Sequence, residues 1–213
     1  MLQLGPRATL SRPDPAERTA LRHHFDEHYW ARLPAVLDPA LLREVQQRLE
    51  AATFAPHRHE QVSPPSIDWI MAPGPPSALL EMLFNDPAIY RDIEEITGCH
   101  HISRFVALLY RMVPGQGHEH HWHDDLMEGR MIGMSVNLGP HYEGGVFELR
   151  DRASERILDV VPNPIPGDAI IFAIDPALQH RVTRVTSGVK TAFAGWFCSG
   201  RSYFDLLRSA VPS

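Results

Sequence analysis

The chain has 213 residues, of which 44% are hydrophobic and 22% are charged, a balance typical of one globular domain. Its net charge of −6 provides no general attraction to phosphate backbones, so we expect no nucleic-acid partner. No segment approaches the ~18 consecutive apolar residues of a membrane span, and we expect no membrane partner. The two cysteines, Cys99 and Cys198, are far apart in sequence, which argues against a disulfide framework and favours a reducing, cytoplasmic location.

The first half of the chain is predicted to be mainly helical. After a tail at residues 1–14, apolar side chains recur every four residues and predict a helix over Pro15–His28. Asp38 followed by Pro39 is a typical helix start, and the apolar stripe after it predicts a second helix ending at Ala52. The other elements predicted in this half are a short strand within Tyr29–Leu37 and helices at Ser77–Phe84 and Pro87–Thr97, the last capped by Asp86 and ended by Gly98.

The segment Thr53–Pro76 contains six prolines and is predicted to be a loop. It includes Trp69, an aromatic side chain that could cover a binding site, so a lid is one interpretation. An ordinary connection between two helices is the simpler one.

From residue 102 onward the pattern changes to short runs of β-branched and aromatic residues separated by glycine and proline. Short strands at this spacing favour a β-sandwich or barrel over residues 102–198, supported by the helical region 15–98. We therefore expect a single domain. The predicted strands are Ile102–Val113, Met131–Leu138, Val146–Arg150, Ile157–Val161, Ala169–Ile174, His180–Val185 and Val189–Cys198.

The densest group of chemically active side chains is the run His118–Asp125. If this run is extended, His121, His123 and Asp125 share one face, because alternate side chains of a strand point the same way. The pair His123 and Asp125, together with one distant histidine, would supply two imidazoles and one carboxylate. These ligands form a facial triad that leaves three positions on Fe(II) free. Spacing alone does not separate such a metal site from a hydrophilic surface loop.

Two other histidine–acid pairs have similar spacing. His24 and Asp26 lie in the first predicted helix, where residues two apart do not share a face, and are interpreted as exposed helix surface. His141 and Glu143 lie in a predicted loop and are not expected to bind metal.

Eight ordered features between residues 102 and 197 accompany the histidine-rich run. They are Leu109-Tyr110, Pro114-Gly115, His123-Asp124-Asp125, Asn137-Leu138, Tyr142-Glu143-Gly144-Gly145, Pro166-Gly167-Asp168, His180 and Lys190. Their order resembles that of the 2-oxoglutarate- and Fe(II)-dependent oxygenases, in particular the prolyl-4-hydroxylase-like branch. The resemblance implies a mainly β fold, with a double-stranded β-helix (jelly-roll) core buttressed by the N-terminal helices.

The resemblance also implies the roles of individual residues. His123, Asp125 and His180 would hold Fe(II). Lys190 would pair with the distal carboxylate of 2-oxoglutarate, and Tyr110 would donate a hydrogen bond to the same group. Many relatives have arginine where this chain has Lys190, so the lysine would bind through one charge rather than a bidentate fork.

The remaining polar and aromatic candidates have more ordinary interpretations. Asn137 could hydrogen-bond the cosubstrate or could serve a structural, backbone-facing role. Trp196 and Phe197 are expected in the core. His118, His120 and His121 are interpreted as residues that support the site or are simply exposed.

The activity implied by the resemblance is hydroxylation of an unactivated C–H bond of a small molecule, amino acid or peptide. O2 would be a second cosubstrate, with succinate and CO2 as coproducts. One alternative is a protein prolyl hydroxylase of the same chemistry. The sequence does not define an oligomeric state.

A second alternative is a cupin-type metal-binding protein without 2-oxoglutarate turnover. His121, His123 and Glu128 reproduce much of the first cupin motif. The second motif would need a histidine about three residues after Pro166-Gly167, and none occurs before His180. The second half of the chain therefore favours the oxygenase.

Overall fold

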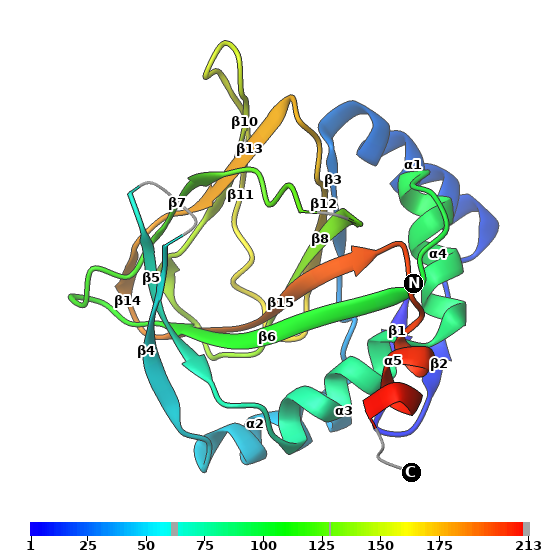
Figure 1. Ribbon diagram of the computed structural model, residues 1–213, viewed down its shortest axis with the longest axis horizontal. Coiled ribbons are helices and arrows are strands. Elements are labelled where there is room, and N and C mark those ends of the chain that lie inside the picture. Colours follow the sequence, from blue (N-terminus) through cyan, green and yellow to red (C-terminus); the bar gives the residue numbers. More distant parts are fainter. Residues whose placement is uncertain (61–63, 128, 211–213) are drawn as a thin grey trace.

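The computed structural model describes residues 1–60, 64–127 and 129–210. Within these ranges the protein is mainly β, with fifteen strands in antiparallel ladders and five helices (Figure 1). The helices are α1 (Pro15–His28), α2 (Pro39–Glu50), α3 (Pro75–Phe84), α4 (Pro87–Thr97) and α5 (Tyr203–Ala210). The strands are β1 (Gln3–Leu4), β2 (Thr9–Ser11), β3 (Trp30–Leu33), β4 (Phe54–His59), β5 (Ser66–Met71), β6 (Arg104–Met112), β7 (His120–His123), β8 (Arg130–Asn137), β9 (Glu143–Gly144), β10 (Phe147–Asp151), β11 (Ile157–Val161), β12 (Ala169–Ala173), β13 (Leu178–Val182), β14 (Val185–Ser187) and β15 (Lys190–Cys198).

Two antiparallel sheets build the body of the molecule. The larger sheet has the strand order β3-β12-β8-β15-β6-β5-β4, and the smaller has the order β11-β10-β13-β7. Residues of both sheets line one cavity, so the sheets face each other across it (Figure 1). At the centre of the larger sheet, β15 pairs with β6 along its whole length and with β8 along most of it. These long ladders give the cavity a rigid wall.

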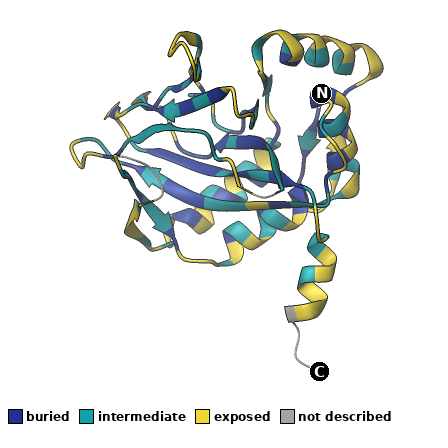
Figure 2. Ribbon diagram, turned by 45° about the horizontal axis from the view of Figure 1, so that its top comes forward, coloured by how far each residue is buried: buried dark blue, intermediate teal, exposed yellow. Residues whose placement is uncertain are grey.

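Helices cover the outer face of the larger sheet (Figure 1) and expose their polar sides (Figure 2). In α4 the buried residues Ile89, Ile93 and Ile96 follow helical spacing and form the apolar stripe that packs into the core. The Asp86 side chain accepts a hydrogen bond from the Ala88 N–H and so caps the start of this helix. Because the helices bury the outer face of the sheet, its inner face is free to line the cavity.

The helices and strands predicted from the sequence pattern are largely confirmed. The four predicted helices are present, and their ends differ from the predicted ones by two residues at most. Gly98 ends α4 with a φ of 67°, a left-handed conformation that glycine adopts without steric cost. Each predicted strand region of the second half overlaps a strand, and β3 lies within Tyr29–Leu37.

The prediction of a loop over Thr53–Pro76 is wrong. Strands β4 and β5 lie in this segment, pair with each other and extend the larger sheet beyond β6. β4 accommodates Pro56 because it is an edge strand, where one N–H side needs no partner. Of the six prolines, Pro56 lies in the edge strand, and Pro75 and Pro76 begin α3, so a proline-rich composition did not exclude regular structure here.

The two ends of the chain also hold structure that the sequence pattern did not indicate. The tail at residues 1–14 forms the β1–β2 pair and buries Leu2 and Leu4, and α5 follows the last strand. None of the helices in the described ranges combines the length and the apolarity needed to span a bilayer.

Candidate functional site

The cavity between the two sheets has a volume of about 560 Å³. This lies within the 300–1,000 Å³ that is usual for small-molecule sites. Its lining includes His123, Asp125, His180, Tyr110 and Lys190, which are five of the six site residues predicted from the sequence. The two sheets therefore bring together residues that lie up to 80 positions apart in the sequence (190 − 110).

The candidate triad stands at the junction of β7 and β13. His123 and His180 are direct partners in the antiparallel ladder, and their ring centroids lie 4.2 Å apart. Asp125 follows β7, with 3.7 Å between its Oδ1 and His123 Nε2 and 3.3 Å between its Oδ2 and His180 Nε2. The metal-ligating atoms of the three side chains all lie within 4.8 Å of one another.

The backbone at Asp125 does not have the extended conformation that we predicted. β7 ends at His123, and Asp125 has a φ of 55°, in the left-handed region that is uncommon for a non-glycine residue. A turn of the backbone, rather than strand alternation, thus aims the carboxylate at the imidazoles. Local strain of this kind is common where a side chain is held for a function.

His121 does not share the face of His123, contrary to the alternation that we expected. Its Nε2 lies 3.1 Å from Glu119 Oε1, whereas His120 and His123 both line the cavity. The ladder between β7 and β13 is irregular between the His180 and Val182 pairs, so the strict period of two is lost there.

The electrostatics of the triad suit metal ligation. Burial and the neighbouring His180 lower the pKa of His123 to about 3, so the imidazole is neutral at physiological pH. Its Nδ1 donates a hydrogen bond of 2.6 Å to the His121 carbonyl, which leaves the Nε2 lone pair available. Burial raises the pKa of Asp125, but hydrogen bonds from His180 and Trp196 outweigh it and hold the pKa well below its usual range.

The donor set fits Fe(II). Two imidazole nitrogens and a carboxylate oxygen that leave other positions open are the ligands of non-haem Fe(II) oxygenases. The side chains of Phe147 and Phe172 pack against the His180 ring at centroid distances of 5.5 and 4.6 Å. These aromatic rings fix the orientation of one imidazole and keep that side of the site dry.

Lys190 is a buried cation at the start of β15, with 4% of its surface exposed. Its Nζ donates a hydrogen bond of 2.6 Å to the Gly145 carbonyl and lies 5.5 Å from the centre of the Tyr142 ring. Gly145 has a φ of 57°, in the left-handed region that favours glycine, and a Cβ there would also lie only 3.1 Å from the Lys190 side chain. Burial lowers the pKa of Lys190 to about 7.

Tyr110 shares the cavity with Lys190, but Asn137 does not. Tyr110 is 3% exposed, and its burial raises the pKa of its hydroxyl, which therefore stays a hydrogen-bond donor at physiological pH. Asn137 is not among the described residues that line the cavity. Its Oδ1 accepts the Gly139 N–H, so the structure favours the backbone-facing alternative for this residue.

Trp196 and Arg130 belong to the site, although the sequence pattern did not assign them to it. Trp196 was expected in the core, but it lines the cavity and its Nε1–H donates a 2.7 Å hydrogen bond to Asp125 Oδ2. The Arg130 guanidinium lies 3.4 Å from the centre of the Trp196 ring and 3.5 Å from Asp125 Oδ1. Strand parity placed Trp196 with Lys190 and Ala194 and could have identified it. Phe197, on the opposite face, lies in the core as expected.

Trp196→Phe is expected to lower the affinity of the site for Fe(II) by about 10- to 100-fold, the range typical of residues hydrogen-bonded to metal ligands. The substitution removes the N–H donor to Asp125 but keeps an aromatic ring beside Arg130. Equilibrium dialysis with metal analysis measures the affinity. Trp122→Phe is a matched control, because Trp122 contacts two arginines away from the triad. An unchanged affinity in Trp196→Phe would contradict this role.

The other histidine–acid pairs remain outside the site. His24 and Asp26 lie on α1, and Asp26 forms an ion pair with Arg22 at the protein surface. Neither His141 nor Glu143 is among the described residues that line the cavity. Glu128, which formed part of the cupin-like spacing, lies outside the described residues.

Comparison with known proteins relates part of this chain to a protein family. Residues 107–198 match the 2OG-Fe(II) oxygenase superfamily. A PKHD-type hydroxylase from Parvibaculum lavamentivorans is 32% identical over 107 residues, which cover 48% of this chain and 43% of the relative. The match thus spans less than half the length of that relative.

Two solved structures share the fold. A prolyl-4-hydroxylase from Pseudomonas putida superposes with a TM-score of 0.63 at 18% identity, covering 86% of this chain and 99% of its own. A prolyl hydroxylase from Trichoplax adhaerens, in complex with a peptide fragment of the hypoxia-inducible factor oxygen degradation domain, gives 0.66 at 14% identity, covering 92% and 93%. The resemblance predicted from the order of the motifs is confirmed: residues 107–198 match the 2OG-Fe(II) oxygenase superfamily, part of the chain is similar to a PKHD-type hydroxylase, and the fold is similar to that of prolyl hydroxylases.

Proposed function

We propose that the protein is an Fe(II)- and 2-oxoglutarate-dependent dioxygenase that hydroxylates an unactivated C–H bond of a small molecule, amino acid or peptide. The observation that carries the proposal is the convergence of His123, Asp125 and His180 in the same cavity as the buried cation of Lys190. The family match over residues 107–198 supports the same reaction class. Fe(II), 2-oxoglutarate and O2 are the cofactor and cosubstrates that this family uses.

Different residues of the cavity have different proposed roles. His123, Asp125 and His180 would hold the metal, which when bound supplies oxidation coupled to decarboxylation of 2-oxoglutarate to succinate and CO2. Lys190 would bind the distal carboxylate of 2-oxoglutarate, and the Tyr110 hydroxyl would donate a hydrogen bond to it. The remaining cavity wall orients the substrate C–H bond and excludes water.

Lys190 also separates the oxygenase from a cupin-type metal protein. A site that only binds a metal through histidines has no need of a second cation in the same cavity. Burying an ammonium lowers its pKa to about 7 here, so the position is unfavourable unless an anion is bound beside it. A dicarboxylate cosubstrate supplies such an anion.

The fold and location that we propose are those expected from the resemblance. The two facing antiparallel sheets support a double-stranded β-helix core over residues 102–198, with the helical region 15–98 as its support in a single domain. Cys99 and Cys198 are both free thiols, which supports a reducing, cytoplasmic location.

The substrate is proposed as a class. A cavity of about 560 Å³ has room for 2-oxoglutarate together with a small molecule, a free amino acid or one side chain of a peptide. The similarity to prolyl hydroxylases supports a second candidate, a prolyl residue in a peptide or protein.

Succinate formation tests the proposal directly. The protein is incubated anaerobically with Fe(II) and 2-oxoglutarate, exposed to O2, and assayed for succinate with panels of free amino acids, proline-containing peptides and small metabolites. We expect succinate that depends on Fe(II), O2 and 2-oxoglutarate, stimulated by one class of substrate. Stimulation only by prolyl peptides would select the second candidate. The absence of Fe(II)-dependent succinate, with and without every panel, would refute the reaction class.

A further inference from the structure

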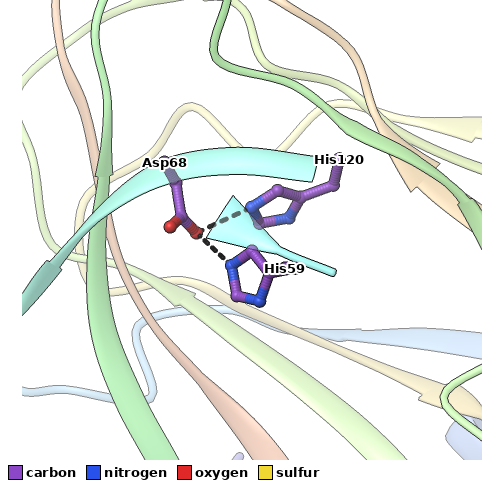
Figure 3. A group of neighbouring side chains, drawn as sticks. All are labelled: His59, Asp68 and His120. Carbon is purple, nitrogen blue, oxygen red and sulfur yellow. Dashed lines mark hydrogen bonds and ion pairs between the residues drawn. The ribbon is translucent and has the colours of Figure 1, made fainter. Parts of the chain in front are cut away.

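A second cluster of two histidines and one aspartate lies beside the candidate triad. His59 at the end of β4, Asp68 on β5 and His120 at the start of β7 converge, as Figure 3 shows. Their ligating atoms lie within 4.8 Å of one another, as in the first triad. Both imidazoles point at the same carboxylate oxygen, with 3.1 Å from His59 Nε2 and 2.9 Å from His120 Nε2 to Asp68 Oδ2 (Figure 3).

Within the described residues, one oxygen of the buried Asp68 carboxylate lacks a hydrogen-bond donor. Asp68 is fully buried, and its Oδ1 has no hydrogen-bond partner among the described residues. A buried carboxylate oxygen without a donor is costly, and such a group in a native protein calls for a specific explanation, of which a bound ion is one. The two histidines contact only Oδ2, whereas an ion bound through both carboxylate oxygens would also compensate Oδ1.

Two of the three separations between ligand atoms are close to those around a bound metal ion, and the third, between the two histidines, is within 4.8 Å. With bonds of about 2.0–2.1 Å to nitrogen and oxygen, adjacent ligand atoms of a tetrahedral Zn²⁺ are separated by about 3.3 Å. The two contacts to Asp68 need to lengthen by only a few tenths of an ångström to reach that value. Each imidazole becomes a ligand if its proton shifts from Nε2 to Nδ1, which changes the tautomer without changing the charge.

We propose that His59, Asp68 and His120 form a second binding site, for a divalent transition-metal ion such as Zn²⁺. All three side chains line the 560 Å³ cavity, and the ring of His57 lies 4.6 Å from that of His59 on the same strand. The ion would neutralise the buried carboxylate and tie the β4–β5 edge of the larger sheet to β7 of the smaller one.

The second site is separate from the candidate iron site. None of its ligands belongs to the first triad, and the nearest pair of rings, His120 and His123, has centroids 6.5 Å apart. Two of its three ligands come from the segment that was predicted to be a loop. The proposal rests on this cluster alone and does not depend on the proposed function.

Metal stoichiometry tests the proposal. The full chain is stripped with chelator, dialysed against buffered low-micromolar Zn²⁺ and analysed for bound metal. We expect two Zn²⁺ per wild-type chain and one per chain in His59→Gln, Asp68→Asn and Asp125→Ala. The double variant Asp68→Asn with Asp125→Ala should bind none.

His121→Gln is the matched control, because its ring faces Glu119 instead of the cluster and the variant should retain both ions. Circular dichroism checks that each variant is folded, and the partly exposed His59 provides a milder substitution than the buried Asp68. One Zn²⁺ in the wild type, lost in Asp125→Ala, would overturn the second site and leave the first intact. Equal binding by His59→Gln and His121→Gln would also overturn it. Loss of one ion in His59→Gln but not in Asp125→Ala would support the second site and count against the first.

Discussion

Asp125→Ala is expected to lower 2-oxoglutarate-dependent succinate formation by more than about 100-fold, beyond the 10- to 100-fold typical of losing a residue that merely supports a ligand. Its carboxylate is the only oxygen donor of the candidate triad. Removing it also leaves the Trp196 N–H and the Arg130 guanidinium without their shared acceptor. Fe(II) affinity should fall together with turnover, and both are measured on the same preparations.

Asp26→Ala is the control for Asp125→Ala. Asp26 belongs to the other His-x-Asp sequence of the chain, but it lies on the exposed surface of α1 and pairs with Arg22. We expect turnover within the error of the wild type in this variant. Wild-type turnover in Asp125→Ala, or a comparable loss in Asp26→Ala, would show that the metal is held elsewhere.

The order of motifs along the chain predicted more of the site than the local spacing did. Strand alternation indicated that His121 and His123 share a face, but an irregular ladder places His120 and His123 on the cavity instead. The left-handed conformation of Asp125 has no signature in the sequence. The triad was identified because a whole series of turns and strands follows the histidine-rich run, whereas backbone details of this kind depend on tertiary packing.

The second histidine cluster was not predicted, for a physical reason. Its members come from β4, β5 and β7, so no short motif contains them. His59 and Asp68 lie in a proline-rich segment that was predicted to be a loop, and only the edge pairing of β4 with β5 brings them together. Nothing in the sequence around Asp68 indicates that this side chain is fully buried. Sites built across strands distant in sequence become visible only when sheet order and register are known.

Lys190→Ala is expected to raise the apparent KM for 2-oxoglutarate by about 10- to 150-fold, the equivalent of a charge-assisted contact of about 1.5–3 kcal/mol. The effect on kcat at saturating 2-oxoglutarate should be much smaller, because Lys190 is proposed to anchor the distal carboxylate and is not a ligand of the metal. Initial rates of succinate formation against 2-oxoglutarate concentration separate the two parameters. An unchanged KM would remove Lys190 from the cosubstrate site.

The same lysine should make the protein less stable at low pH when 2-oxoglutarate is absent. Burial lowers its pKa from the usual 10.5 to about 7, so the unfolded chain binds more protons than the native one between these values. The stability of the wild type therefore rises with pH from about 7 to 10.5, and below pH 7 the cost of the buried charge is fully present. Lys190→Met, which removes that charge, should be more stable than the wild type, with an advantage of at most about 5 kcal/mol at pH 6 and about 2 kcal/mol at pH 9.

Denaturant unfolding at the two pH values measures this difference, and saturating 2-oxoglutarate should reduce it by about 1.5–3 kcal/mol, because the anion binds the wild type more tightly than the variant. Lys190 is the only lysine in the chain, so selective ¹³C or ¹⁵N labelling of lysine gives one NMR signal that reports its pKa directly. We expect that pKa to rise when 2-oxoglutarate binds, since an anion beside the ammonium favours its charged form. A lysine signal that titrates near 10.5 in the free protein, or that does not respond to 2-oxoglutarate, would contradict both the burial of the cation and its role as the anchor.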